Sequence, residues 1–594
     1  MKTCAWAFVL LVFLLPARLL AQTDTVDVKD FFDIGGGEGT LNTEVQAKID
    51  AGTLSNTVFR LKPYGYYVLT SRITVPAGKR FTLISPTPGT TQETSPAMIV
   101  WTPSGPNTTF NFDCFGDIYM KNIWILYATT NQVDLGTQVG SALEIDEDTT
   151  DHVNVGVFDN VIFDYAPISN GGGSVTVTAS HARLTFTNCY FRNNTDTHFR
   201  YYGRAVSFPF GTQGWHIDVC SFENCTFANM GYVYMQEGSE YTDTLKFNHC
   251  TFLNTMMYTL EFGWWNWLSV TNSIYVNPYM FGFFRTEGAT AHGGALNIDS
   301  VGKGNFTFLV PFTDAQRHVL FANNSYFVEK WLVDYMTPYN ASTNPTGGNP
   351  YSNAVFLINP DSVPRPQPMM SEKTKSFFNN KAAFPYFTMM NVYDSTNPGF
   401  LIPPTNVQGI KTFLYKKWTD NSDTTWAFDP HSDITQSWPM NEQLRYSNST
   451  LKAAGMGGFP LGDLYHWWNS QPTIYSGWKA QAATENTTIS NLLKNGTTDV
   501  QEAAAPPVEF ELSQNYPNPF NPTTQINYSI PQRSSVSLKV FNLLGMEVAT
   551  LFSGMQEAGP HVAPFDATRF SSGVYFYRLQ AGSVSITKKM VFMK

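Results

Sequence analysis

An eight-residue pattern recurs through the first half of the chain and limits its fold more than any other feature. The clearest copies span residues 186–193, 222–229, 247–254 and 270–277, and weaker copies begin at residues 120, 158 and 321. The third position is asparagine or, once, histidine, and it falls at residues 122, 160, 188, 224, 249, 272 and 323. The intervals between these positions run from 23 to 51 residues. We interpret the longest interval as two repeats, with Asn297 at the corner between them.

Variable intervals with a lower limit near 23 residues are typical of a solenoid whose coils carry loops of different length. The copies are rich in Phe, Tyr, Val, Thr and Asn, which favour strands and turns and exclude a helical repeat. In each coil the asparagine turns the corner between two strands. Stacking in register then predicts a hydrogen-bonded column of Asn160, Asn188, Asn224 and Asn272, and an internal column of free thiols at Cys189, Cys225 and Cys250.

Two further strand segments, residues 58–69 and 73–84, precede the repeats and are separated by turn residues. Together with the repeats they resemble the right-handed parallel β-helix of the pectin-lyase-like superfamily. The resemblance implies that an amphipathic helix at 41–51 caps the first coil. We therefore expect an all-β chain, with a right-handed parallel β-helix solenoid and its N-terminal cap at 22–330. Prolines interrupt the pattern at 331–483, where we expect irregular outer coils and a C-terminal cap.

Residues 510–594 form a separate module. Residues 536–540 alternate apolar and polar side chains at the period of a half-buried strand, and glycines separate the later runs. This spacing predicts a small Ig-like β-sandwich, preceded by a linker rich in Asn, Thr, Ala and Pro at 484–509. The phrases at 512–522, 572–579 and 588–594 resemble the type A C-terminal sorting domain of the type IX secretion system. The alternative is an adhesive or carbohydrate-binding sandwich, because a fold does not determine function.

The N-terminus has the features of a secretory signal peptide. Lys2 precedes an apolar run, Pro16 ends that run, and Ala21 provides a small residue before the expected cleavage, so residues 1–21 are predicted to be removed. No later stretch is long and apolar enough to cross a membrane. We expect export through the periplasm to the outer cell surface or the extracellular medium, with the type IX secretion machinery as partner. The net charge of −10 argues against a nucleic-acid partner.

An acidic run at 143–152 is the candidate metal site. Glu144, Asp146, Asp148 and Asp151 offer the oxygen ligands that calcium prefers. In the resembled superfamily, lyases combine calcium with a basic residue, and Arg183, Arg192, Arg200 and Arg204 follow within two coils. The alternative is an ordinary solvated loop, with or without calcium. The sequence requires no cofactor, and calcium is the candidate ion.

Trp264, Trp265 and Trp267 form the densest aromatic cluster and are the candidate carbohydrate-binding residues. Adjacent residues of a strand face opposite sides, so Trp264 and Trp265 cannot both be internal. The exposed ring would either stack on a sugar or pack beneath a neighbouring loop.

Three functional hypotheses remain open from the sequence. The first is a secreted or cell-surface β-helix protein that binds glycan or belongs to the cell envelope. The second is a polysaccharide lyase or a related carbohydrate-active enzyme, and the third is a structural fibre or adhesin. Hydrolases of the resembled superfamily carry an Asp-Asp pair and an Arg-Ile-Lys step, and the repeat region has neither. The sequence therefore identifies no catalytic residue and leaves enzymatic activity undecided.

Overall fold

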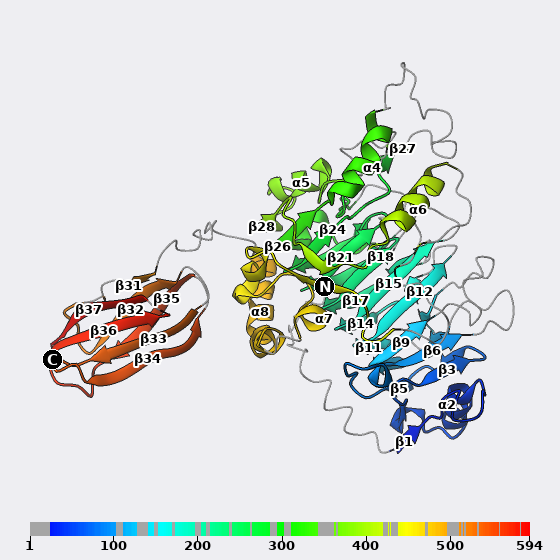
Figure 1. Ribbon diagram of the computed structural model, residues 1–594, viewed down its shortest axis with the longest axis horizontal. Helices are drawn as coiled ribbons and strands as arrows, with labels where there is room; N and C mark the ends of the chain where they lie inside the picture. The colour runs from blue at the N-terminus through cyan, green and yellow to red at the C-terminus, as the bar shows by residue number, and fades with distance from the viewer. Residues whose placement is uncertain are drawn as a thin grey trace, which may run out of the picture. The chain divides into compact units, whose positions relative to one another are not determined.

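The computed structural model describes residues 24–101, 111–126, 141–147, 152–168, 173–196, 203–208, 214–236, 240–261, 264–284, 294–301, 310–341, 362–363, 366–419, 426, 428, 437–469, 473–495, 510–512, 515, 518–530, 534–556, 559–582 and 584–593. Two compact units are present, and the second consists of residues 497–594 with the short segment 456–459 (Figure 1). The predicted signal peptide at 1–21 lies outside the described residues.

The larger unit is a parallel β-helix with three strand ladders. The first ladder contains β1 (Asp24–Asp27), β2 (Thr57–Arg60), β5 (Arg80–Ile84), β8 (Asp117–Lys121), β11 (Val155–Asp159), β14 (Ala182–Thr187), β17 (His216–Glu223), β20 (Tyr241–Asn248), β23 (Trp265–Thr271), β26 (His318–Phe327) and β28 (Tyr386–Tyr393). The second contains β3 (Tyr66–Leu69), β6 (Ala97–Trp101), β9 (Ile123–Leu126), β12 (Ile162–Ile168), β15 (Tyr190–Asp196), β18 (Thr226–Met230), β21 (Thr251–Thr255) and β24 (Ile274–Val276). The two ladders join at β26 as one 19-stranded sheet.

The third ladder is a separate seven-stranded sheet. It contains β4 (Ile73–Val75), β7 (Phe112–Cys114), β10 (Leu143–Asp146), β13 (Gly173–Thr178), β16 (Arg204–Ser207), β19 (Tyr234–Met235) and β22 (Leu260–Glu261). The chain visits the three ladders in turn, as β10, β11 and β12 and then β13, β14 and β15 show. The predicted solenoid of short parallel strands is therefore confirmed.

Asparagine forms the corner between the first and second ladders because it tolerates the left-handed backbone conformation. Asn160, Asn188, Asn224 and Asn272 have φ between 52° and 56°. Their backbone N–H groups bond to the following coil, as in Asn188 N to Glu223 O at 2.9 Å. The repeated asparagines are therefore turn residues, as their spacing predicted.

The interval between Asn272 and Asn323 is one coil and not two. Strand β23 pairs directly with β26, with Trp267 opposite His318, so no coil lies between them. Asn297 follows Leu296, which bridges to Leu260 on the side of the seven-stranded sheet, and it is not a corner. The prediction for Asn297 is wrong because a long insertion mimics the length of a second repeat. The first ladder also extends past residue 330, since β28 adds one more strand.

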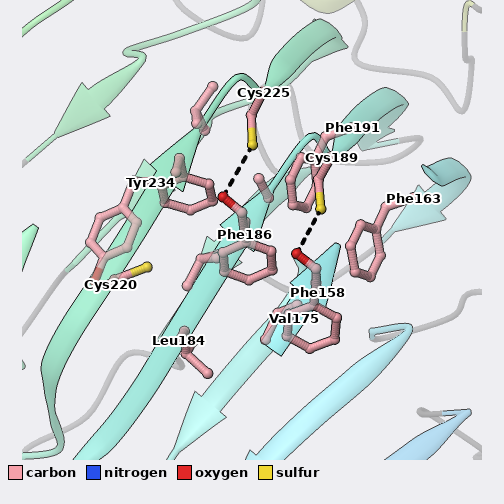
Figure 2. Close-up of a cluster of buried hydrophobic side chains, with 14 of the residues drawn as sticks. Phe158, Phe163, Val175, Leu184, Phe186, Cys189, Phe191, Cys220, Cys225 and Tyr234 are labelled. Atoms are coloured by element: carbon pink, nitrogen blue, oxygen red, sulfur yellow. Dashed lines mark hydrogen bonds between the residues drawn. The ribbon is translucent and has the colours of Figure 1, made fainter. Parts of the chain in front are cut away.

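Stacked aromatic rings fill the interior of the coils (Figure 2). Phe158, Phe186, Phe222 and Phe247 form one stack, with ring centroids 4.6–4.8 Å apart. Phe163, Phe191, Phe227 and Phe252 form a second stack, with centroids 4.7–5.1 Å apart. These spacings follow the distance between neighbouring strands, so each coil packs its rings on those of the next.

The column of thiols lies beside these rings, and all five cysteines in the described part of the chain are buried and free. Each thiol of the column donates to a phenylalanine carbonyl of the preceding coil: Cys189 to Phe158 O at 3.4 Å, Cys225 to Phe186 O at 3.5 Å and Cys250 to Phe222 O at 3.6 Å. Figure 2 shows the first two of these bonds. The predicted internal column of free thiols is confirmed.

Helices and short antiparallel pairs complete this unit. The helices are α2 (Thr40–Asp50), α4 (Lys330–Ala341), α5 (Glu372–Asn379), α6 (Val407–Thr419), α7 (Leu464–Trp468) and α8 (Tyr475–Asn495). The pairs are β25 (Phe283–Phe284) with β27 (Ser362–Val363), and β29 (Phe400–Ile402) with β30 (Gln443–Tyr446). Helix α2 matches the predicted cap at 41–51 and buries Leu41 and Val45. Helix α8 occupies residues 484–495, where the composition predicted a linker, because buried Glu485 anchors it to β20.

The second unit is a β-sandwich. One sheet contains β31 (Glu511–Leu512), β32 (Thr523–Ile530) and β35 (Gly559–Asp566), and the other contains β33 (Ser534–Phe541), β34 (Glu547–Gln556), β36 (Gly573–Ala581) and β37 (Val584–Phe592). Both sheets are antiparallel. Leu538, Tyr577 and Phe565 lie in their common core, so this unit has a hydrophobic centre of its own.

Candidate functional site

The seven-stranded sheet has a polar outer face. Side chains alternate along a strand, so residues next to core positions point away from the core. Phe112 and Leu143 belong to the core, and the residues that follow them, Asp113 and Glu144, lie on the opposite face. Strand pairing continues this face through Thr74, Asp113, Glu144, Thr176 and Ser207. A row of acidic and hydroxyl side chains suits a polar ligand.

Three carboxylates gather on this face. One oxygen each of Asp113, Glu144 and Asp146 lies within 4.8 Å of the others. Thr178 Oγ1 lies 3.1 Å from both Glu144 Oε1 and Asp146 Oδ1, so one hydroxyl proton serves two carboxylates. Arg72 Nη1 approaches Asp113 Oδ2 at 3.5 Å, which is a long contact for an ion pair. Glu147 N also donates to Asp146 Oδ1 at 2.8 Å, so Asp146 has more hydrogen-bond donors than Asp113 or Glu144.

Burial disfavours negative charge in this acidic group. It raises the pKa of Glu144 to about 7, and repulsion from Asp146 adds to the effect. It also raises the pKa of Asp113, although Arg72 opposes that shift. Asp113 is only 6% exposed, and its Oδ1 has no hydrogen-bond partner among the described residues. Buried Asn111 lies two residues before Asp113, and neither its Oδ1 nor its Nδ2 has a hydrogen-bond partner among the described residues.

The structure brings together two of the four predicted calcium ligands. Glu144 and Asp146 converge, whereas Asp148 and Asp151 lie outside the described residues. Asp113 was missed because it stands 31 positions before Glu144 in the chain. The signal that could have found it is the coil interval, since a solenoid places residues one coil apart side by side.

The three candidate tryptophans lie in different environments. Trp265 is fully buried in the main core, and Trp264 is 7% exposed in a small cluster with Val310 and Phe312. Neither ring has a face open to a sugar, and the carbohydrate-binding role of half-buried Trp267 stays a prediction. The rings of Trp267 and His318 stack at 3.7 Å, and Tyr386 stacks on the other face of His318 at 4.1 Å.

The candidate arginines that the structure describes take other partners than the acidic group. Arg192 is buried, and it forms ion pairs with Asp164 at 3.1 Å and with Glu442. Burial opposes its charge, but these two carboxylates hold the pKa of Arg192 above its usual value. Arg183 pairs with Asp218 on the first ladder, and the guanidinium of Arg204 lies over the Tyr232 ring. Arg200 lies outside the described residues. Arg72 contacts Asp113 of the acidic group, and the sequence analysis did not single it out.

The asparagine column at the first corner is only partly linked by side chains. Asn160 Nδ2 donates to Asn122 Oδ1 at 2.8 Å. Asn188 Nδ2 donates to Asp159, Asn272 Nδ2 donates to Asn248, and Asn224 Oδ1 accepts from Leu464 N. The predicted chain of bonds through Asn160, Asn188, Asn224 and Asn272 is therefore absent from this part of the structure, because side chains of the first ladder and the C-terminal cap take its place.

A continuous column lies one corner further on. Asn229 Nδ2 donates to Asn193 Oδ1 at 3.2 Å, Asn254 Nδ2 to Asn229 Oδ1 at 3.1 Å, and Asn277 Nδ2 to Asn254 Oδ1 at 2.9 Å. These four residues end the four clearest copies of the repeat. These asparagines therefore have a structural role. The polar face of the seven-stranded sheet remains the candidate functional site.

Comparison with known proteins identifies one segment of the chain. Residues 514–593 match the family model of the secretion system C-terminal sorting domain, which covers almost all of the β-sandwich. The match supports export by type IX secretion and implies interaction with that machinery. No curated protein matches the chain. Within the described residues, every helix is too short or too polar to span a membrane.

Proposed function

We propose that this exported β-helix protein binds an acidic polysaccharide of the cell envelope or surroundings through a calcium ion on the outer face of the seven-stranded sheet. Asp113, Glu144 and Asp146 would hold the ion. Calcium would supply the positive charge that links these carboxylates to the acidic groups of the glycan. The sorting domain supports the location, because it directs the chain to the cell surface or beyond.

The observation that carries this proposal is the spacing of the three carboxylates. Calcium binds oxygen at 2.3–2.6 Å, so ligands on opposite sides of the ion lie about 4.6–5.2 Å apart. The oxygens of the acidic group fall within 4.8 Å of one another. The raised pKa of Glu144 and the unpartnered Oδ1 of Asp113 also favour a cation, because a cation would stabilise both charges.

Calorimetric titration with calcium tests the ion site, and titration with polygalacturonate in calcium then tests the glycan. We expect the double variant Asp113→Asn, Glu144→Gln to lose both heats of binding. Glu44→Gln, an exposed carboxylate on α2, is the matched control and should keep both. Equal calcium binding by the double variant and the control would exclude the acidic group as the ion site. Calcium binding without polygalacturonate binding would reject this glycan class.

A polysaccharide lyase is the second candidate. The observation that favours it is Arg72, whose side chain is 45% exposed beside Asp113. In this alternative calcium would acidify the proton on the carbon next to a sugar carboxylate, and a basic group would remove it. The electron pair would form a carbon–carbon double bond as the glycosidic carbon–oxygen bond breaks, and the departing oxygen would take up a proton from water. The reaction forms an unsaturated product that absorbs ultraviolet light. Product that accumulates with the parent chain and not with Arg72→Ala would establish the lyase, whereas binding without product would support a binding protein.

A further inference from the structure

Two histidines and an aspartate converge on the first ladder, on strands different from those of the acidic group. His181 immediately precedes β14, and His216 and Asp218 lie in β17. Ala182 pairs with Ile217, so the preceding residues His181 and His216 lie side by side on neighbouring coils. The register of the solenoid thus unites groups that are 35 residues apart in the chain.

The three potential ligand atoms form a nearly equilateral triangle. His216 Nε2 lies 3.2 Å from His181 Nδ1, and His181 Nδ1 lies 3.1 Å from Asp218 Oδ1. The third side, from His216 Nε2 to Asp218 Oδ1, measures 3.6 Å. Zinc binds nitrogen and carboxylate oxygen at 2.0–2.2 Å with tetrahedral geometry, which separates neighbouring ligand atoms by about 3.3–3.6 Å. The triangle has the dimensions of one face of that tetrahedron.

Neighbouring groups hold the triangle in place. Tyr241 stacks on the His216 ring at 4.7 Å, and Arg183 Nε donates to Asp218 Oδ2 at 3.2 Å. These contacts orient the ligands in the way that outer partners do in metal sites.

The three side chains differ in their exposure to solvent. The His216 side chain is 10% exposed and Asp218 18%, whereas His181 is 50% exposed. Two ligands are thus anchored in the wall of the solenoid, and the third faces solvent, which gives an ion a route of entry. The alternative to an ion is a proton on His181 Nδ1, which could bond to both Asp218 Oδ1 and His216 Nε2.

We propose that His181, His216 and Asp218 bind a divalent transition-metal ion of the zinc class. Two imidazoles and one carboxylate suit zinc, whereas calcium prefers an all-oxygen ligand set. Three protein ligands leave a fourth tetrahedral position for water. Because the ligands come from β17 and from the corner before β14, the ion links two neighbouring coils. This site lies on the first ladder. It is independent of the proposed calcium site, which lies on the seven-stranded sheet.

Metal content and spectroscopy test this site. The purified full-length chain is loaded with Zn²⁺, passed through a desalting column and analysed by inductively coupled plasma mass spectrometry, where we expect one bound zinc per chain. Replacement by Co²⁺ should give the intense visible absorption of tetrahedral cobalt. His181→Ala should weaken zinc binding at least about 10-fold, since even outer partners of metal ligands contribute 10–100-fold. His181 is exposed but has a φ of 62°, so circular dichroism would check that the variant keeps the fold of the parent chain.

His152→Gln is the matched control. His152 lies 3.2 Å from Asp117 on the same ladder, but it forms a pair where His181 belongs to a triangle. The control should bind zinc as tightly as the parent chain. Absence of stoichiometric zinc in the parent would show that a proton alone joins the three residues. Equal affinity in His181→Ala and the parent would place the zinc elsewhere. Either result would overturn the proposal.

Discussion

Asn229 shows how a single side chain joins neighbouring coils. Its φ of 59° sets a corner, its Nδ2 donates to Asn193 Oδ1 and Pro404 O, and its Oδ1 accepts from Asn254 Nδ2. Asn229→Ala should lower the free energy of unfolding by about 1–3 kcal/mol, because it leaves a buried polar group unpaired. Asn491→Ala, at an exposed position of α8, is the control. Urea unfolding of both variants measures the difference, and equal stabilities would show that the column contributes nothing.

The thiol column leads to a prediction about reactivity. Burial raises the pKa of Cys189 and Cys225 well above the usual value, and the thiolate is the reactive form. We expect iodoacetamide to leave Cys189, Cys225 and Cys250 unmodified in the folded protein and to modify all three in urea. Peptide mass spectrometry reads the sites directly. A disulfide among the three residues under mild oxidation would contradict the stacked register.

At this scale the repeat predicted which residues turn corners and which point inward, since both depend on local spacing. It did not predict which asparagine column is continuous. That outcome depends on distant segments: Leu464 N binds Asn224, and Tyr475 OH donates to Asn188. Both residues lie in the C-terminal cap, more than 200 positions away. Local patterns carry no information about such partners.

Helix α8 is the element whose composition was most misleading. Its Asn, Thr and Ala residues predicted a linker, but the buried carboxylate of Glu485 anchors the helix to the solenoid. Glu485 accepts from Asn248 Nδ2 at 2.7 Å and Trp478 Nε1 at 3.2 Å, and it lies 3.3 Å from His249 Nε2. The hydrophobic pattern of a single helix face could not show this, because the anchor is polar. Similarly, the length of the interval between Asn272 and Asn323 could not show whether the extra residues before β26 form a loop or an additional coil.

The anchor of α8 predicts a dependence on pH. Burial would raise the pKa of Glu485, but His249 and the hydrogen bonds to the carboxylate lower it below 4.5. A lowered pKa adds stability above the unfolded value of 4.5 and loses it as the pH falls through the folded value. Glu485→Gln should therefore lower the free energy of unfolding at pH 7 by about 1–3 kcal/mol. The difference from the parent chain should shrink toward pH 3.

Urea unfolding of the two chains at pH 7, 5 and 3 measures this dependence. Glu372→Gln is the control, because Glu372 is an exposed acid of α5 that pairs with Lys375 on the surface. It should follow the parent at every pH. A stability difference for Glu485→Gln that stays constant from pH 7 to pH 3 would show that the charge of Glu485 does not anchor the helix.

The molecule as a whole combines two units with separate cores. The cores share no residue, so each unit has the interior it needs to fold alone. The sequence predicted this division because the repeat stops and a different strand pattern begins. The candidate sites were harder to predict, since Asp113 with Glu144 and His181 with His216 meet only when the coils stack. The two proposed metal sites lie in the solenoid, and the sandwich matches the secretion system sorting domain.

Deletion of residues 510–594 should therefore separate export from folding. We expect the truncated chain to lack the sorting domain's signal and to remain inside the outer membrane, while the solenoid keeps its thermal transition. Fractionation and immunoblotting locate the chain, and circular dichroism follows the melting of both proteins. The matched control is Glu372→Gln, an exposed substitution in a chain that keeps its sorting domain, and it should appear outside the cell at the normal level. Appearance of the truncated chain outside the cell at the normal level would remove the export role from the sandwich, and loss of the solenoid's transition would show that the two cores depend on each other.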